Sequence, residues 1–318
     1  MIITLTANPS LDRTVSLSGA LVPGGVHRIV SDRTGPGGKG INVALGVARA
    51  GLDTLAVFPA DEGDPLLGLV DRAGLPHRAT PLGGRVRTNL TVLSDPDVTT
   101  KINEPGPTLT QEQVEALETA LADAVADGDI AMLSGSLAPG LPVDEYARLV
   151  PALRARGVWV GVDTSDAPLV ALAEAGREGA PDFLKPNAEE LGQLTGADGA
   201  ALEAQAKAGE VAGVRDAARR LHDAGVSDVL VTLGGAGAVL VTAGGAWYAP
   251  SPDAPVVSTV GAGDSAVAGY LIARAQGGEG PDRLALAVAY GAVAVSLPGT
   301  TIPMRDQVHP DVSTVVEI

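Results

Sequence analysis

One glycine-rich segment ends in a carboxylate and leads into a helical pattern, a combination that could transfer a phosphoryl group. Residues 259–264 read Thr-Val-Gly-Ala-Gly-Asp, and the pattern that follows predicts a helix over 265–275. The small residues at 261–263 leave backbone amides free at the helix start, where the helix dipole adds partial positive charge. By itself, Asp264 could be only a capping carboxylate. Beside an anion cradle, it could instead take the proton of an attacking hydroxyl.

A second glycine-rich segment, residues 35–42, reads Gly-Pro-Gly-Gly-Lys-Gly-Ile-Asn and precedes a predicted helix over 43–50 that ends at Gly51. Its spacing excludes a P-loop, which needs glycine six residues before its lysine and Ser or Thr directly after it. It also differs from a dinucleotide fingerprint, because no clear strand leads into it. A helix start with Lys39 and Asn42 suits an anion or a polyol. The alternative is a plain tight turn.

Two further segments could bind a nucleotide or a metal ion. Residues 233–237, Leu-Gly-Gly-Ala-Gly, follow a predicted strand and could line a nucleotide or form only a hairpin turn. Residues 185–190 read Lys-Pro-Asn-Ala-Glu-Glu, in which Asn187 and Glu190 have the spacing of a capping box. The same pair could hold magnesium through water, because Mg²⁺ keeps several waters and takes few protein carboxylates.

The elements that must position these segments alternate between short strands and amphipathic helices. Buried strands are predicted over 130–133, 158–162, 183–184 and 229–233. Helices are predicted over 142–156, over 214–224, and after a capping box formed by Thr110 and Gln113. Such alternation predicts an α/β fold with a mostly parallel central sheet and helices on both faces.

Two regions, about 12–33 and 85–103, depart from this alternation and predict a small antiparallel sheet with one polar side. In the second region, a turn is expected at 94–97. The polar face of its two strands carries charged and hydrogen-bonding side chains: Arg85, Arg87, Asn89, Thr99, Lys101 and Asn103. A small sheet with a polar face, attached to an α/β body, predicts a lid over a site.

Composition limits the partners of this chain. Its 318 residues suit one large α/β domain or two small ones. With 38 acidic and 22 basic residues, the net charge of −16 argues against nucleic acid and anionic membranes. The absence of cysteine excludes disulfides and cysteine–metal sites. The N-terminus lacks a signal-peptide pattern, and glycines and polar residues interrupt the uncharged stretches 229–252 and 284–304. We therefore expect a cytoplasmic protein without a membrane span.

Taken together and in order, these segments make the chain similar to the PfkB family of carbohydrate kinases. The resemblance is carried by residues 6–12 (Thr-Ala-Asn-Pro-Ser-Leu-Asp), 37–42 (Gly-Gly-Lys-Gly-Ile-Asn), 87–89 (Arg-Thr-Asn), 102–107 (Ile-Asn-Glu-Pro-Gly-Pro), 134–137 (Ser-Gly-Ser-Leu), 162–165 (Val-Asp-Thr-Ser), 185–187 (Lys-Pro-Asn) and 260–265 (Val-Gly-Ala-Gly-Asp-Ser). It implies a three-layer ribokinase-like fold in a single domain over 1–318, with a β-sheet lid. The motifs at residues 6–12 and 102–107 are most similar to the branch of 1-phosphofructokinases and tagatose-6-phosphate kinases.

The resemblance also implies a role for residues in each motif. It makes Asp264 the catalytic base, beside an anion hole formed by Gly261, Ala262 and Gly263. The residues implied to bind the substrate are Asp12, Gly38, Lys39, Asn42, Arg87, Asn89, Lys101, Asn103 and Ser136. The residues implied to bind ATP are Lys185, Asn187, Thr232, Gly234, Gly237 and Gly263. Asn187 and Glu190 would also organise Mg²⁺, largely through water.

The cations near the predicted site favour a phosphorylated substrate. Although the chain is acidic, four cations gather near the lid and the glycine-rich segment 35–42: Lys39, Arg85, Arg87 and Lys101. Arg28 is a further candidate. Charge-assisted hydrogen bonds from such groups contribute about 1.5–3 kcal/mol each. Lys101 stands where the family pattern has an acidic residue, which leaves the identity of the phosphosugar open.

We therefore expect an ATP- and Mg²⁺-dependent phosphotransferase with an alcohol acceptor that converts a ketohexose monophosphate, foremost fructose 1-phosphate to fructose 1,6-bisphosphate. Tagatose 6-phosphate and fructose 6-phosphate are the alternative substrates. A dinucleotide-dependent oxidoreductase is disfavoured by the context of the glycines, and a non-catalytic sugar-phosphate-binding protein by the intact Asp264. Because lid strands present unpaired edges, which the family often pairs, we expect a homodimer through the lid.

Overall fold

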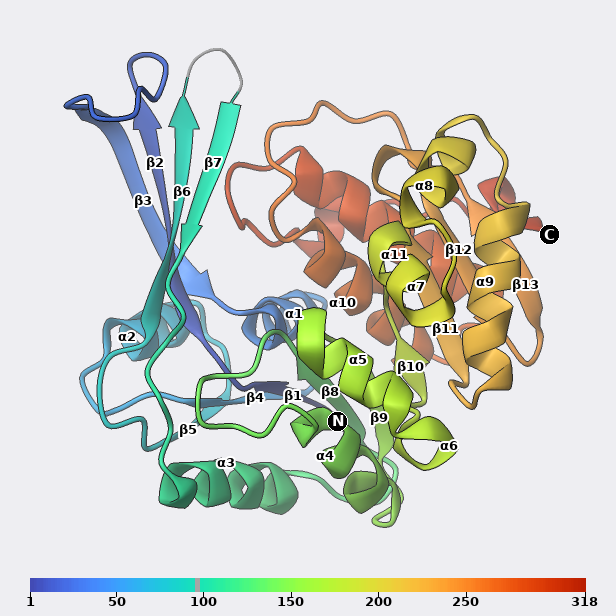
Figure 1. Ribbon diagram of the computed structural model, residues 1–318, viewed down its shortest axis with the longest axis horizontal. Helices are drawn as coiled ribbons and strands as arrows, with labels where there is room; N and C mark the ends of the chain where they lie inside the picture. Colours follow the sequence, from blue (N-terminus) through green and yellow to red (C-terminus); the bar gives the residue numbers. More distant parts are fainter. Residues whose placement is uncertain (95–97) are drawn as a thin grey trace.

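The computed structural model describes residues 1–94 and 98–318 and has an α/β architecture built on one large sheet (Figure 1). In spatial order its strands are β14 (Val316–Glu317), β13 (Gly245–Ala249), β12 (Ala238–Thr242), β11 (Asp228–Thr232), β10 (Phe183–Leu184), β9 (Trp159–Asp163), β8 (Ile130–Ser134), β1 (Ile2–Thr6), β4 (Thr54–Pro59) and β5 (His77–Thr80). Neighbours from β5 to β11 pair in parallel, and those from β11 to β14 pair antiparallel. The mostly parallel central sheet is confirmed.

Helices cover both faces of this sheet and complete three layers. They are α1 (Lys39–Arg49), α2 (Pro65–Arg72), α3 (Gln111–Ala124), α4 (Glu145–Arg154), α5 (Asp166–Glu174), α6 (Gly176–Gly179), α7 (Ala188–Thr195), α8 (Gly199–Lys207), α9 (Ala212–Asp223), α10 (Ala262–Ala275) and α11 (Gly280–Val295). Ile2 of β1 packs with α1, α10 and α11, whereas its neighbour Ile3 packs with α3, α4 and α9. Successive residues of the strand point to opposite faces of the sheet and therefore contribute to two separate apolar cores. No helix among the described residues is both long and apolar enough to cross a membrane.

The predicted buried strands correspond to β8, β9, β10 and β11 to within one residue. Thr110 and Gln113 form the expected capping box at the start of α3. The prediction that no strand leads into residues 35–42 is wrong, because β3 (Ile29–Gly37) leads into them and α1 begins already at Lys39. Glycine and proline at the end of β3 lack the alternating side chains that mark a strand. Since β3 pairs antiparallel within a second sheet, it differs from the parallel strand of a dinucleotide site.

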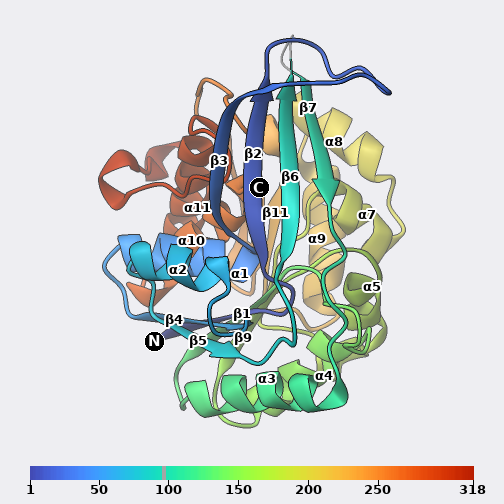
Figure 2. The ribbon, with the colours of Figure 1, turned by 90° about the vertical axis from the view of Figure 1, so that its left-hand side faces the viewer.

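The second sheet is the predicted lid, and it stands clear of the main body over one end of the large sheet (Figures 1 and 2). Its strand order is β3, β2 (Ser10–Leu17), β6 (Arg87–Ser94) and β7 (Val98–Asn103). The two central strands pair in parallel, which corrects the expectation of a purely antiparallel sheet. Apart from Ser94, the turn expected at 94–97 lies outside the described residues.

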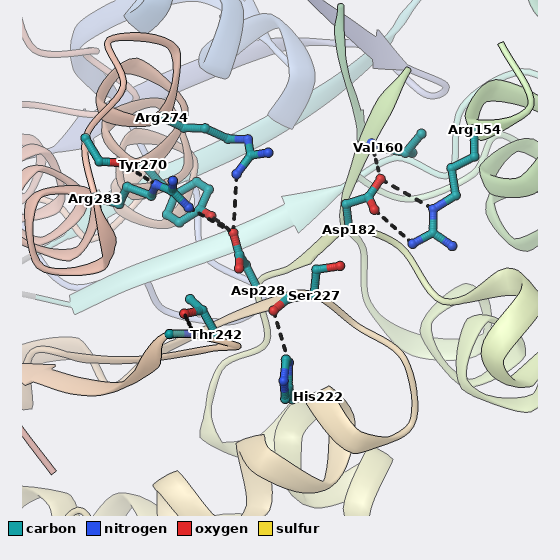
Figure 3. A network of polar contacts seen from close by, with 12 residues as sticks. Arg154, Val160, Asp182, His222, Ser227, Asp228, Thr242, Tyr270, Arg274 and Arg283 are labelled. Atoms are coloured by element: carbon teal, nitrogen blue, oxygen red, sulfur yellow. Dashed lines mark hydrogen bonds and ion pairs between the residues drawn. The ribbon is translucent and has the colours of Figure 1, made fainter. Parts of the chain in front are cut away.

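A polar network anchors the far end of α10 to the start of β11 (Figure 3). The Asp228 carboxylate accepts a hydrogen bond from the Tyr270 hydroxyl and lies 3.3 Å from Arg283 Nη1 and 3.5 Å from Arg274 Nη1. The Arg274 guanidinium also lies over the Trp159 ring, 4.0 Å from its centroid. These contacts fix α10 at the end opposite to its glycine-rich start, so its first turn is held in a defined position.

We predict that replacing Gly269 by Ala destabilises the fold, because α10 and α11 approach each other most closely at this glycine. A Cβ at position 269 would lie 2.5 Å from the Leu286 carbonyl oxygen, and a backbone atom cannot move aside as a flexible side chain does. Such overpacking costs about 1–3 kcal/mol. Urea denaturation followed by circular dichroism measures the free energy of unfolding.

Gly68, inside α2, is the matched control. A Cβ there would lie 3.4 Å from the mobile end of Arg72, which is an ordinary contact. Gly68→Ala is therefore expected to stabilise the protein by about 0.5–1 kcal/mol, since alanine favours helix more than glycine does. Equal effects of the two substitutions would contradict the packing argument.

Candidate functional site

Asp264 lies in the first turn of α10, below the lid and beside the ends of the parallel strands. The helix begins at Ala262, three residues before the predicted start, and Gly261 caps it with φ 81°. Asp264 is therefore inside the helix and makes no capping hydrogen bond. Its Oδ2 instead accepts a hydrogen bond from Asn42 Nδ2 at 2.8 Å. The capping interpretation of Asp264 is wrong, and its carboxyl group is free for another role.

The environment of Asp264 tunes it as a proton acceptor. Burial raises its pKa to about 6, and the negative charge of Asp163 acts in the same direction. The charges of Lys39 and Lys185 and the hydrogen bond from Asn42 oppose this shift. A carboxyl group with a pKa near the working pH can both hold and release a proton, which suits a general base.

Asp163 joins the two lysines beside this base, although the sequence analysis assigned it no role. It ends β9 and is fully buried. Its Oδ1 lies 2.9 Å from Lys39 Nζ and 3.3 Å from Lys185 Nζ. Burial would raise the pKa of Asp163, but the two ammonium groups outweigh it and hold the pKa below its ordinary value. A charged residue that closes the apolar run 158–162 was the signal available in the sequence.

The glycine-rich segment 35–42 carries Lys39 and Asn42 to this site on α1. Gly38 caps α1 with φ 112°, and a Cβ there would lie 2.5 Å from Thr6 Cγ2. Only glycine fits this backbone and this space. Burial would lower the pKa of Lys39, but the charges of Asp163 and Asp264 raise it above its ordinary value, so Lys39 stays protonated.

One row of the lid sheet presents polar side chains to the body. Asp12 on β2 is in register with Asn89 on β6, which is in register with Asn103 on β7. Asp12 Oδ1 accepts hydrogen bonds from Ser10 Oγ at 2.8 Å and Asn89 Nδ2 at 3.2 Å. Burial raises the pKa of Asp12, while these hydrogen bonds and the charge of Arg87 oppose the shift. This row can bind hydroxyl groups.

Arg87 lies at the base of the lid, where it meets the body. Its Nη2 donates to Ser136 Oγ at 3.4 Å, its Nη1 to the Glu104 carbonyl at 3.1 Å, and its Nε to the Asn8 carbonyl at 3.3 Å. Asn8 Nδ2 also lies 3.4 Å from Ser136 Oγ, so side chains from both sheets converge here. The guanidinium is held in place by protein oxygens and remains beside the polar row of the lid.

Three other predicted cations are more peripheral. Lys101 lies exposed on the polar face of β7, one row beyond Asn103. Arg85 precedes β6 rather than lying on it, and Arg28 precedes β3; both are exposed. The sequence predicted strand positions for Arg85 and Arg28 because polar and apolar residues also alternate in the extended segments before β6 and β3. The strands themselves begin later, at Arg87 and Ile29.

Residues 233–237 and 259–264 both contribute to the lining of one cavity of about 390 Å³. Its walls are mostly small and apolar, and the predicted residues among them are Thr232, Gly234, Gly237 and Gly263. Residues 233–237 connect β11 to β12 as a hairpin, as the simpler interpretation predicted, and nucleotide binding by this segment stays a prediction. A Cβ on Gly237 would lie 2.0 Å from the Ala249 carbonyl oxygen, which explains the glycine.

Asn187 and Glu190 form the capping box of α7, as the simpler interpretation predicted. Asn187 Oδ1 accepts from the Glu190 amide at 2.8 Å, and Glu190 Oε2 accepts from the Asn187 amide at 2.9 Å. The backbone of Asn187 also forms an isolated parallel β-bridge with Thr232, which lines the cavity. The box does not use Glu190 Oε1, which leaves one carboxylate oxygen for another partner.

The turn after α11 contributes two residues that the sequence analysis missed. A Cβ on Gly299 would lie 3.2 Å from Thr14 Oγ1 of the lid, and one on Gly261 would lie 3.8 Å from the Thr300 Cα. This turn therefore connects the lid to the start of α10, a contact between distant segments that no local pattern signals.

Known proteins share both the sequence and the fold of this chain. The profile of the pfkB family carbohydrate kinases matches residues 6–307. The chain is 35% identical over 307 residues to 1-phosphofructokinase from Rhodobacter capsulatus, covering 95% of this chain and 92% of the relative. Its fold is similar to that of Escherichia coli phosphofructokinase-2 in complex with substrates and products, with a TM-score of 0.85 and 29% identity over 96% of each chain. Ribokinase from Thermotoga maritima, 20% identical with a TM-score of 0.71 over 96% of this chain and 97% of that chain, shares the fold.

We predict that Asp264→Asn is more stable than the wild type above pH 6. The carboxyl pKa is about 6 in the folded protein against an ordinary value of 3.8, so the folded state binds the proton more tightly. The contribution of this carboxyl group to stability is complete below its ordinary pKa of 3.8. This contribution is lost as the pH rises through the folded-state pKa of about 6. The resulting penalty is up to about 3 kcal/mol at neutral to alkaline pH.

Urea unfolding of both proteins at about pH 8 and about pH 4 measures this difference. The amide introduced by Asp264→Asn is neutral at both pH values, so the advantage of the variant should be largest at the higher pH and shrink at the lower one. Parallel pH dependences of the two proteins would contradict the raised pKa.

Proposed function

Because this chain belongs to the pfkB family of carbohydrate kinases, we propose that it transfers the γ-phosphoryl group of ATP to fructose 1-phosphate and forms fructose 1,6-bisphosphate. The observation that carries this proposal is the position of Asp264. Its buried carboxyl group follows Gly263, which lines the cavity, and it accepts a hydrogen bond from Asn42 of α1 beside Lys39. The 1-phosphofructokinase from R. capsulatus supports the choice of substrate.

In this reaction Asp264 takes the proton of the attacking sugar hydroxyl. The oxygen of the substrate is itself the nucleophile, so the protein has to supply a base, positive charge and alignment rather than a covalent intermediate. The backbone amides of 261–263 at the start of α10 face the charge that develops on the transferring group. Lys39 and Lys185 add two ammonium groups at the same place.

The lid supplies the contacts for the sugar phosphate. Asp12, Asn89 and Asn103 bind hydroxyl groups, and Arg87 with Ser136 binds the phosphate already present on the sugar. Lys101 lies one row further out and adds positive charge at the rim. A lid that closes over the substrate excludes water and limits hydrolysis of ATP.

ATP occupies the cavity beside 233–237, with its phosphates directed toward Gly263 and Lys185. A Cβ on Gly263 would lie 3.7 Å from Lys185 Nζ, so this ammonium group lies beside the amides of the glycine loop. The small, apolar walls of the cavity suit the flat faces of a base.

Magnesium accompanies ATP in this proposal, and Asn187 and Glu190 would hold it largely through water. The residues fit such a site, because the capping box leaves Glu190 Oε1 free while fixing the orientation of both side chains. The described residues contain no group of three or more potential acidic, histidine or cysteine ligands. Mg²⁺ keeps several of its waters and takes few protein carboxylates, so we propose contacts largely through water. When bound, the ion would neutralise charge on the phosphates of ATP.

The acceptor specificity tests this function. We expect ADP release with fructose 1-phosphate to exceed that with tagatose 6-phosphate, fructose 6-phosphate, ribose and adenosine. Asp264→Asn should lower kcat by about 10²–10⁴-fold, the usual contribution of a general base. A chelator should stop ADP release, and added Mg²⁺ should restore it. Comparable rates with ribose or adenosine, or an Asp264→Asn variant as fast as the wild type, would refute the proposal.

Arg87 and Arg13 form a matched pair within the same assay. Arg87→Met should raise KM for fructose 1-phosphate by about 10–100-fold, because it removes a charge-assisted contact to the substrate phosphate. Arg13 lies on β2 with its side chain on the other face of the lid, where it pairs with Asp32 at 2.6 Å. Arg13→Met should leave KM unchanged.

We also propose that the lid pairs with the lid of a second copy of this chain. The face of the lid opposite to Asp12 carries Val15, Leu90 and Val92. On its edge strand the same face exposes 48% of Val98 and 55% of Ile102. Apolar side chains beside an unpaired strand edge favour association, which would cover both.

For this dimer we expect a solution mass of twice the 31.8 kDa chain, measured by light scattering coupled to gel filtration. Ile102→Asp should shift the protein to the monomer, because it places a charge in the apolar contact. Val143, which is 51% exposed outside the lid, provides the control substitution Val143→Asp, which should remain dimeric. A monomeric wild type would refute pairing through the lid.

A further inference from the structure

The carboxylate of Asp163 holds two lysines that come from opposite sides of the site. Lys39 reaches it from α1, and Lys185 from the segment between β10 and α7. Both ammonium groups share Oδ1, at 2.9 Å and 3.3 Å, while Oδ2 is buried and has no hydrogen-bond partner among the described residues. A single fully buried oxygen atom thus sets the positions of two long, flexible cations.

The two lysines differ in what they can reach. Lys185 is 5% exposed and lies against the glycine loop of α10, whereas the Lys39 side chain is 34% exposed. The charges of both lysines act on the pKa of Asp264. Without Asp163, both lysines would lose the carboxylate that they share, and Asp264 is a second buried carboxyl group beside them.

We propose that Asp163 is a positioning residue for phosphoryl transfer, which holds Lys39 and Lys185 toward the transferring phosphoryl group and away from Asp264. This inference rests on the proposed kinase function. Asp163 does not take a proton or touch the substrate. It keeps two positive charges next to the base without letting them pair with it, so the base remains available for the substrate hydroxyl.

Because neighbouring charges set the pKa of Asp264, the positioning role of Asp163 can be recognised in the pH dependence of activity. The charged groups that act on it are Lys39 from α1, Asp163 from β9 and Lys185 from the segment before α7, and Glu190 of α7 acts on Lys39. Removing the charge of Asp163 leaves two unopposed cations and lowers the pKa of Asp264. Removing Lys39 raises that pKa, because its charge is the largest influence that opposes burial.

The test compares Asp163→Asn, Lys39→Met and the double variant in steady-state ADP release, using the sugar phosphate that the wild type converts fastest. We expect Asp163→Asn to lower kcat by about 10²–10³-fold, as for the loss of a preorganised charge, and to change KM by less than about threefold. The double variant should lose less than the product of the two single losses, because the two residues act as a unit.

The acid limb of the kcat/KM profile, which reports the pKa of the free enzyme, should move in opposite directions in the two single variants. It should lie below the wild-type position, about pH 6, in Asp163→Asn, and above it in Lys39→Met. Asp182, which pairs with Arg154 at 2.9 Å before β10, is the control (Figure 3). Asp182→Asn also removes a half-buried ion pair next to the sheet, but it should leave the acid limb in place.

Three results would overturn the proposal: wild-type kcat in Asp163→Asn, an acid limb that does not move, or activity of this variant that excess Mg²⁺ fully restores. The last result would assign Asp163 to the metal instead. If Asp163→Asn fails to fold, Asp163→Glu takes its place: it keeps the negative charge but displaces it, so it should still lower kcat, and wild-type kcat in this variant would overturn the proposal. The titration of Asp264, followed by ¹³C NMR without substrate, should show the same two shifts, so failure of the assigned reaction remains distinguishable from failure of the positioning role.

Discussion

The burial of one carboxyl group at the start of α10 is the constraint on which the rest of this site depends. An ionised carboxylate away from water is unfavourable unless neighbouring groups compensate it. Here Asn42 supplies one hydrogen bond, and Lys39 and Lys185 supply positive charge, yet the pKa of Asp264 remains raised to about 6. The compensation is incomplete, so the pKa of this carboxyl group lies close to neutral pH, as its proposed role as a base requires.

Such a residue needs a rigid support, because a mobile carboxylate would turn toward water or pair with a lysine. The fold provides this support at both ends of α10. At its start the glycines allow the backbone to turn sharply, and at its far end Tyr270 and Arg274 bind Asp228 at the start of β11. Between these ends, Gly269 lets α11 pack directly against the helix backbone.

The lid completes the site from a different part of the chain. Strands β2 and β6 are far apart in sequence but pair in parallel, and this pairing brings Asp12 next to Asn89. The turn after α11 approaches the lid at Thr14 and the start of α10 at Gly261. One turn therefore lies against both parts of the chain that the proposed function needs, the lid and the glycine-rich start of α10.

Local patterns in the sequence determined much of this protein. Apolar periodicity located β8 to β11, capping signals located the starts of α3 and α7, and the ordered motifs predicted the family and the α/β fold. The strand before α1 was missed, because its glycines and proline hide the alternation on which the prediction depended. The role of Asp163 was missed for a different reason: a lone aspartate after an apolar run has no local feature that shows which cations will reach it. That was decided by the tertiary structure, which brings together charges more than a hundred residues apart, and the electrostatic balance that sets the pKa of Asp264 exists only at those distances.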